Sequence, residues 1–388
     1  AFSVISLSFI ISTLVILIIL ETTLIVFNKG RQLSDGDYGW STWSSGNENL
    51  FKAFLGPSAA ELYIPHSNEI NQFGFRGKPM EDSPMNIVLL GDSNVETSHP
   101  LNKMPERHLS NELEQRIGFM PNVISMGSWG WGTDQQYLAL KQHIDDINPS
   151  HVLLWFISND YKDNTYPWGN SGRKPTFWLS DNELQGPNHQ FLEEFQPEKF
   201  RLTRLLERRE LLGPNLDQDK GFYKKYVEPN IMPMEAIKPC SDGIDFDLTM
   251  SDWSSRFAEP RPNWLEYQKK LTRELLLRTK TLAESRGSKF SIFYVRRPDY
   301  GNPNLNIPMK TICSKEFGEV TYAHENFDKL IEETFQGTEH YYIDLASYNP
   351  SMKLTVADYG DKFDGHFNDE FVKYIMKEVA NTIEKDRL

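Results

Sequence analysis

Short apolar segments that alternate with longer helix-forming segments constrain the fold of this 388-residue chain more than any other feature. The apolar segments are expected strands and cover residues 86–90, 122–126, 151–158, 289–296 and 341–345. The expected helices cover residues 104–117, 133–147 and 264–286, with a last helix capped by Asn368. Strands that alternate with helices predict a parallel sheet with helices on both faces. We therefore expect an α/β fold, a three-layer α/β/α sandwich around five parallel strands.

Two long stretches do not follow this alternation. Residues 28–82 are rich in Gly, Ser, Asn and aromatic residues without a sustained period, so we interpret them as an irregular leader packed on the domain. The domain itself is expected over residues 83–388. Within it, residues from about 165 to 262 are rich in Pro, Trp, Phe and charged residues. This insertion is long enough to form a lid over a site or a surface for a partner.

The N-terminal stretch is strongly apolar. Residues 2–27 contain one charge, Glu21, and supply the roughly 20 apolar residues that a membrane helix needs. The alternative, a buried core helix, would be shorter and less apolar. No small-residue cleavage site stands out, which favours an uncleaved transmembrane anchor over residues 1–27 rather than a signal peptide. Lys29 and Arg31 follow the helix, and positive flanks tend to stay cytoplasmic, so the sequence leaves the orientation of the anchor open.

The composition argues against some binding functions. The net charge of −13 argues against a nucleic-acid partner, which would require a basic patch or stripe. The nine histidines are scattered, without an HExxH motif or a Cys/His cluster, so neither a metal nor another cofactor is expected. The two cysteines, Cys240 and Cys313, either pair in an oxidising compartment or are two unrelated buried thiols.

Polar residues follow the expected strands at the points where the strands end. They are Ser93 in Gly-Asp-Ser after the first strand, Gly127 after the second, Asn159 after the third, and Asp361, Asp364 and His366 after the fifth. Ligands of an open parallel sheet bind outside the carboxyl ends of its strands. We therefore expect these residues to meet at one edge of the sheet.

These residue types are the components of an acyl-transfer site. A serine becomes a nucleophile when a histidine takes its proton, and an acid fixes the tautomer of that histidine. We expect Ser93 as the nucleophile, His366 as the base and Asp364 as the acid, with Asp361 as the alternative acid. The donors expected in the oxyanion hole are the backbone N–H groups of Ser93 and Gly127 and the side-chain amide of Asn159.

With these motifs the chain resembles the SGNH/GDSL hydrolase family, in particular its membrane-anchored bacterial members. The four marker residues of that family would be Ser93 in GDS, Gly127, Asn159 in SND, and His366. Residues 71–77 (NQFGFRG) and 122–164 also resemble stretches of those proteins. The resemblance implies a flavodoxin-like SGNH hydrolase fold, an acyl-serine intermediate, and work beside a membrane-bound acyltransferase.

The chain departs from the family pattern at two places. Many members have the acid three residues before the histidine, where this chain has Phe363; Asp364 gives the D-x-H spacing of alginate O-acetyltransferase-like relatives. Relatives often read GDSFTEG where this chain reads GDSNVET, so Asn94 and Val95 alter the wall beside the nucleophile while Glu96 keeps its place. Three tryptophans near the site are either core residues or platforms for sugar rings: Trp129, Trp131 and Trp168.

Together with the apolar N-terminal stretch, the resemblance implies a single-pass bacterial membrane protein with a periplasmic domain. The expected activity is that of a serine esterase or O-acyltransferase acting on O-acyl groups, acetyl first among them, of a cell-surface glycan. The expected partners are the acyl-ester or glycan substrate and the membrane, through residues 2–27; other integral membrane proteins are candidates. The alternative is a non-catalytic accessory or structural subunit of a membrane complex built on the same fold.

Overall fold

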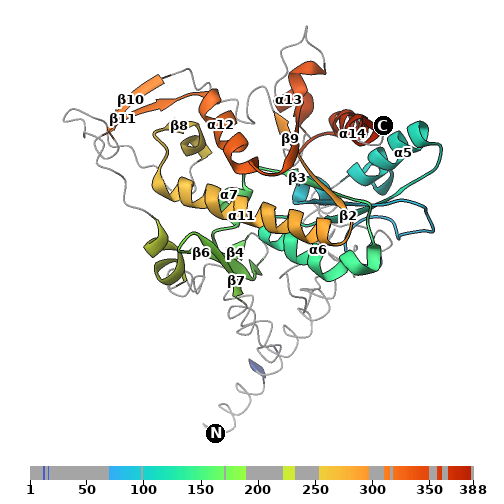
Figure 1. Cartoon of the computed structure of the whole chain (residues 1–388), viewed down its shortest axis with the longest axis horizontal. Helices are drawn as coiled ribbons and strands as arrows, with labels where there is room; N and C mark the ends of the chain where they lie inside the picture. The colour runs from blue at the N-terminus through green and yellow to red at the C-terminus, as the bar shows by residue number, and fades with distance from the viewer. Residues whose placement is uncertain are drawn as a thin grey trace.

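The central element of the computed structural model is a five-stranded parallel sheet (Figure 1). The structure describes residues 12, 13, 16, 70–97, 99–169, 172–188, 222–231, 253–296, 310–314, 318–348, 356–360 and 366–385. The strands of the central sheet are β1 (Asn86–Gly91), β2 (Asn122–Gly127), β3 (His151–Phe156), β9 (Lys289–Arg296) and β12 (Glu339–Asp344). Every neighbouring pair is parallel, which confirms the five expected strands.

The order of the strands locates the place where a ligand can bind. Across the sheet the order is β12-β9-β3-β1-β2, so the second strand in sequence lies on one side of β1 and the later strands lie on the other. The chain therefore reverses its winding direction between β1 and β3. In open parallel sheets this reversal leaves a crevice outside the carboxyl ends of the two strands. The loops after β1 and β3 hold Ser93 and Asn159.

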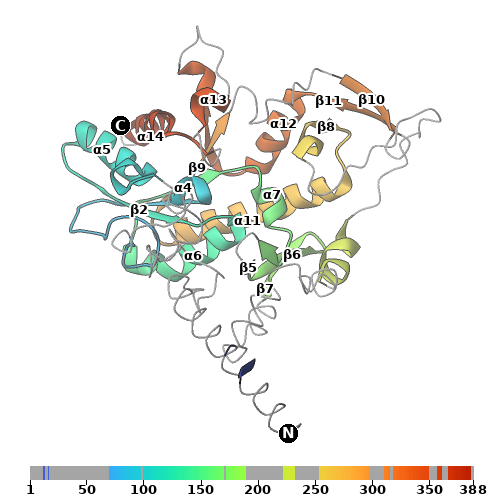
Figure 2. The same ribbon diagram turned by 180° about the vertical axis from the view of Figure 1, so that it is seen from behind.

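Helices cover both faces of the sheet, as the alternating pattern predicted. The main helices are α5 (Pro105–Ile117), α6 (Thr133–Ile147), α11 (Asn263–Ser285), α12 (His324–Phe335) and α14 (Asp369–Lys385). Figures 1 and 2 show α6 beside α11 and α5 beside α14, on opposite sides of the strands. The arrangement is compatible with a three-layer sandwich.

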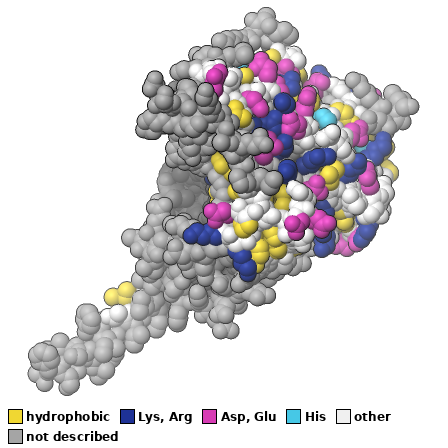
Figure 3. Space-filling model, turned by 60° about the vertical axis from the view of Figure 1, so that its left-hand side comes forward, with side chains coloured by type: hydrophobic (Ala, Val, Ile, Leu, Met, Phe, Trp, Pro, Cys, Tyr) yellow, Lys and Arg dark blue, Asp and Glu magenta, His cyan; other side chains and the backbone are white. Residues whose placement is uncertain are grey.

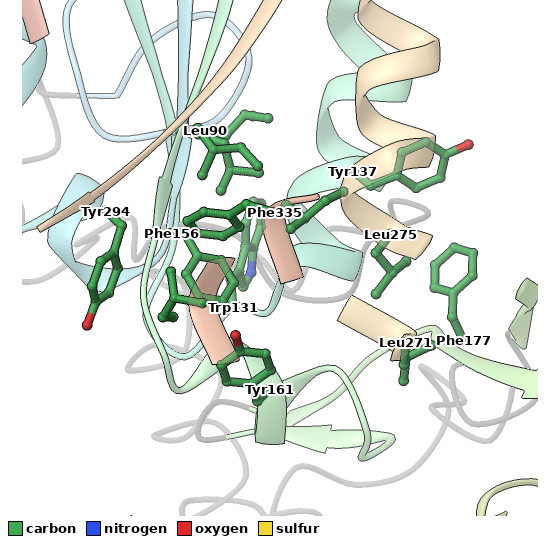
Figure 4. Packing of buried hydrophobic residues seen from close by; sticks show 14 of the residues in the cluster. Leu90, Trp131, Tyr137, Phe156, Tyr161, Phe177, Leu271, Leu275, Tyr294 and Phe335 are labelled. Atoms are coloured by element: carbon green, nitrogen blue, oxygen red, sulfur yellow. The ribbon is translucent and has the colours of Figure 1, made fainter. Parts of the chain in front are cut away.

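Two apolar cores result from the alternation of side chains along each strand. Leu90 and Phe156 point to the face covered by α6, α11 and α12. Leu89 and Trp155, one residue earlier in their strands, point to the face covered by α5 and α14. Figure 4 shows the first of these cores, where Phe156 and Phe335 meet edge to face with ring centroids 5.0 Å apart. Burying one such side chain stabilises the fold by roughly 1.5–3 kcal/mol.

The described parts of the expected insertion fold as β-hairpins and short helices, of which β6 and β7 contact α11 and η5 contacts α12. Its elements are β4 (Trp168–Gly169), β5 (Gly172–Arg173), β6 (Thr176–Ser180), β7 (Glu183–Asn188), η3 (Tyr223–Val227), η4 (Glu228–Asn230), η5 (Trp253–Phe257) and β8 (Ala258–Glu259). Phe177 of β6 joins the core under α11 (Figure 4). A small antiparallel sheet of order β10-β11-β8 includes β10 (Lys310–Ser314) and β11 (Gly318–Tyr322), which the sequence pattern did not predict.

The expected membrane anchor, the leader and the cysteine pair fall largely on residues that the structure does not describe. No helix in the part of the chain that the structure describes is long and apolar enough to cross a membrane. Of the expected anchor, residues 1–27, only Ser12, Thr13 and Ile16 are described, all helical, so the anchor stays a prediction. Residues 28–69 of the expected leader and Cys240 lie outside the described residues, whereas Cys313 lies in β10.

The surface of the described residues mixes charges of both signs. On the face seen in Figure 3, basic and acidic side chains lie interspersed over the coloured area. The described part of this face therefore lacks the continuous basic stripe that contacts to a nucleic-acid backbone require.

Candidate active site

A tight turn after β1 presents Ser93 at the edge of the sheet. Ser93 is the first residue of the short helix α4 (Ser93–Glu96), and the carboxylate of Asp92 caps this helix by accepting from the N–H of Asn94 at 2.9 Å. A Cβ atom at Gly91 would clash with the side chain of Val95, which packs against the turn. The sequence Gly-Asp-Ser thus supplies the small residue, the cap and the hydroxyl that this turn needs, and Ser93 keeps 8% of its surface exposed.

His366 lies beside this serine although 273 residues separate them in sequence. Its Nε2 atom is 2.7 Å from Ser93 Oγ, within hydrogen-bond reach of a base and its nucleophile. The start of α14 fixes the position of the histidine, because Asn368 Oδ1 caps the helix by accepting from the N–H of Phe371 at 3.1 Å. The neighbouring Phe367 is buried in the core on the face of the sheet that α5 and α14 cover. Asp364 and Asp361 lie outside the described residues, so the acid of the site stays a prediction.

Gly127 packs directly against the turn that carries Ser93. It ends β2 in register with Gly91 of β1. A Cβ at Gly127 would lie 2.8 Å from the carbonyl oxygen of Asp92 and 2.8 Å from Cβ of Val95, so only glycine fits. Its backbone therefore lies against the peptide that leads into Ser93, the position expected for an oxyanion donor.

Asn159, after β3, directs its amide toward the same turn. Its Nδ2 donates to Asp163 Oδ2 at 2.8 Å and to Asp92 Oδ2 at 3.3 Å. Two carboxylates can only accept from this group, which fixes the orientation of the amide. The bond to Asp92 is the longer of the two, so an oxyanion near Ser93 would compete for that N–H.

Buried carboxyl groups surround this amide. Burial raises the pKa of Asp163 to about 6, and the Asn159 amide opposes the rise. Asp160 is fully buried and accepts from Thr133 Oγ1 at 3.0 Å. Burial, together with the charges of Asp92 and Asp163, raises the pKa of Asp160 well above its usual range. Carboxyl groups with little access to water thus hold the loop that carries Asn159 in place.

The insertion contributes two buried cations to this region, which sequence reasoning missed. Lys174 forms an ion pair with Asp134, with both side chains fully buried. Arg256 is 6% exposed and donates from Nη1 to Ser158 Oγ at 3.2 Å, one residue before Asn159. Burial lowers the pKa of Arg256 to about 10. In a single sequence, no spacing rule distinguishes these two side chains from ordinary surface cations.

The three tryptophans have different positions. The backbone N–H of Trp129 donates to Glu96 Oε2 at 2.7 Å, and its ring centroid lies 5.2 Å from that of His366. Trp131 is fully buried and meets Phe75 edge to face at 5.6 Å, so it is a core residue. The side chain of Trp168 lies outside the described residues. Of the three, Trp129 borders the serine–histidine pair.

Among the residues that the structure describes, no group of three or more His, Cys, Asp or Glu side chains could hold a metal ion. No protein-family model matches the chain, and no curated protein matches it significantly. Fold and site together define an α/β protein with a serine–histidine pair at the carboxyl edge of a parallel sheet.

Proposed function

We propose that the chain is a serine hydrolase or O-acyltransferase of the SGNH/GDSL type, with a flavodoxin-like three-layer sandwich fold. The observation that carries the proposal is the 2.7 Å separation of His366 Nε2 and Ser93 Oγ at the strand-order reversal of the sheet. The positions of Gly127 and Asn159 around the same turn support it, because acyl transfer needs donors for a developing oxyanion.

In this proposal the reaction has two halves. Ser93 Oγ attacks the acyl carbonyl carbon while His366 Nε2 takes its proton. The resulting oxyanion accepts hydrogen bonds from the N–H groups of Ser93 and Gly127 and from the Asn159 amide. The bond to the leaving alcohol then breaks, and that oxygen takes the proton from His366, which leaves an acyl-serine. Water or a sugar hydroxyl then attacks the acyl carbon while His366 takes its proton. The bond between the acyl carbon and Ser93 Oγ breaks, and His366 gives that proton to Ser93 Oγ. Asp364 is the proposed partner that orients His366.

The proposed substrates are O-acyl esters, acetyl esters in particular, of a cell-surface glycan. The ring of Trp129 beside His366 supports a sugar-containing substrate, since an aromatic face can stack on a sugar ring. Residues 2–27 would anchor the domain in a bacterial membrane on its periplasmic side, near other integral membrane proteins. Water as acceptor makes the protein an esterase, and a sugar hydroxyl makes it a transferase.

Hydrolysis of p-nitrophenyl acetate by single-residue variants tests the proposal. We expect Ser93→Ala to abolish turnover and labelling by a fluorophosphonate, whereas Ser347→Ala, an exposed serine, should change neither. Asn159→Ala should lower kcat roughly 10²–10³-fold, the cost of one lost oxyanion donor. Thermal unfolding of each variant checks that the fold is retained. A wild-type protein that resists the fluorophosphonate would favour the accessory-subunit alternative.

A further inference from the structure

The end of the leader folds into a turn that is fixed to the central sheet. Asn71 organises this turn, since its Oδ1 accepts from the N–H groups of Phe73 at 3.0 Å and Phe75 at 3.1 Å. Its Nδ2 donates to the carbonyl of Ser125 in β2 at 3.2 Å. Arg76, which follows, is only 4% exposed. The turn therefore places the guanidinium of Arg76 inside the domain at a fixed position.

This guanidinium holds the segment that follows the nucleophile helix. It donates to the carbonyls of Glu96, at 3.1 Å, of Thr97 and of His99. Thr97 has a φ of +40°, a left-handed conformation that a β-branched residue rarely adopts. A guanidinium offers several donors in one plane, which suits three neighbouring carbonyls better than the single ammonium of lysine. Arg76 therefore stabilises an unfavourable turn, residues 96–99, immediately after Ser93.

Residues of the same turn reach the catalytic histidine by two routes. The carboxylate of Glu96 accepts from the N–H of Trp129 at 2.7 Å, and the ring of Trp129 packs against the ring of His366. His99 Nε2 donates to the carbonyl of Phe367 at 2.8 Å, the residue directly after His366. One route supports the imidazole ring, and the other supports the backbone that carries it.

We propose that Arg76 is a positioning residue that sets the separation of Ser93 and His366. Through its bonds to the carbonyls of the 96–99 turn it fixes the end of the helix that carries Ser93 and both supports of the histidine. The consequence for catalysis rests on the proposed function. The consequence for geometry does not, because the Ser93–His366 hydrogen bond exists in the protein whether or not an ester is cleaved.

Kinetics of Arg76→Lys in the full chain test the catalytic part. Lysine keeps the charge but cannot donate to three carbonyls in one plane, so the turn should relax. A misplacement of about 1 Å costs roughly 10²-fold in rate, so we expect kcat to fall roughly tenfold to hundredfold with KM unchanged. Arg261→Lys is the matched control, because Arg261 is also buried and bonds Glu333, away from Ser93. Equal kcat values in the two variants, both folded, would overturn the proposal.

A structural readout separates this inference from the proposed function. Nitrogen-15 NMR of the His366 ring reports its hydrogen bond to Ser93, and Arg76→Lys should weaken that bond. If the wild-type protein cleaves no ester but the bond still weakens, the proposed function fails and the positioning role stands. An unchanged ring signal in Arg76→Lys refutes the positioning role.

A milder variant covers the case in which Arg76→Lys does not fold. His99→Ala leaves Arg76 in place and removes the buried imidazole that donates to the carbonyl of Phe367. We expect this variant to fold and to lose kcat without a change in KM, by a smaller factor than Arg76→Lys. A His99→Ala protein with the kcat of the wild type and an unchanged His366 ring signal would contradict the proposal.

Discussion

Replacing Lys174 by methionine should destabilise the domain strongly, because it leaves a carboxylate buried without its counter-charge. Lys174 and Asp134 form an ion pair with both side chains at 0% exposure. Asp134 lies in the first turn of α6, and its backbone N–H donates to Asn164 Oδ1 at 3.1 Å, at the end of the loop that carries Asn159. Methionine keeps most of the apolar stem of lysine, so the change removes the charge and little packing.

The expected loss follows from the burial of the pair. Breaking a buried ion pair by removing one partner costs roughly 3–5 kcal/mol. At about 2 °C per kcal/mol for a large domain, the melting temperature should fall by roughly 6–10 °C. In the wild type, burial raises the pKa of Asp134 above its ordinary value of 3.8, and the Lys174 ammonium opposes that rise. Without the ammonium the folded-state pKa rises further above the unfolded value, so the variant loses stability as pH increases and its deficit narrows as pH approaches 4.

Urea and thermal unfolding at pH 5 and pH 7.5 measure this effect. The decisive comparison is the double variant Lys174→Met/Asp134→Leu, in which both charges are gone. A buried ion pair replaced by apolar residues is often neutral or more stable, so the double variant should recover most of the loss. The reasoning is refuted if Lys174→Met costs less than about 1 kcal/mol, the upper range for a surface pair, or if the double variant is as unstable as the single one.

Two further variants probe the packing and the titration of buried groups near the site. Gly127→Ala places a Cβ 2.8 Å from the carbonyl oxygen of Asp92, so kcat should fall about 10²-fold as the nucleophile turn shifts; unchanged kcat in a folded variant would contradict this packing. Burial raises the pKa of Glu106 from 4.5 to about 8, so the folded protein keeps a proton that the unfolded chain loses. Wild-type stability should therefore fall by up to about 1.4 kcal/mol per pH unit between these two values. Glu106→Gln should remove that slope in urea unfolding, and an identical slope would disprove it.

The sequence was sufficient to predict the elements whose signals are local. Apolar runs such as His151–Phe156 read as buried parallel strands, and every residue of this strand is indeed buried. Asn368 was expected to cap the last helix, and its side chain does so. The approach of Ser93 and His366 followed from topology alone, because strands of a parallel sheet end at the same edge. These inferences needed only the spacing of apolar residues, the preference of asparagine for helix caps and one rule about parallel sheets.

The missed features divide into two kinds. Helix α12 had a local signal that could have found it, since Phe327, Leu330, Ile331 and Phe335 repeat at helical spacing on one buried face. The positions of Lys174 and Arg256 had none, because lysine and arginine are almost always exposed unless a partner distant in sequence neutralises them. Their burial depends on tertiary pairing, which no local pattern encodes.

These two cations change the interpretation of the insertion. A lid would need only to cover the mouth of the site, and its removal would leave the residues below it intact. Lys174 and Arg256 instead lie beneath the loop that carries Asn159, among the carboxyl groups of Asp134 and Asp163.

Without those cations the acids would protonate or draw in water, because an isolated buried carboxylate is costly. The hydrogen bonds that orient the Asn159 amide would then weaken, since a protonated acid accepts hydrogen bonds more weakly than a carboxylate. The insertion is therefore expected to fold together with the sheet and to support the loop that carries Asn159, the proposed oxyanion donor. A domain shortened across residues 165–262 should lose both its stability and its alignment of Asn159, even with Ser93 and His366 untouched.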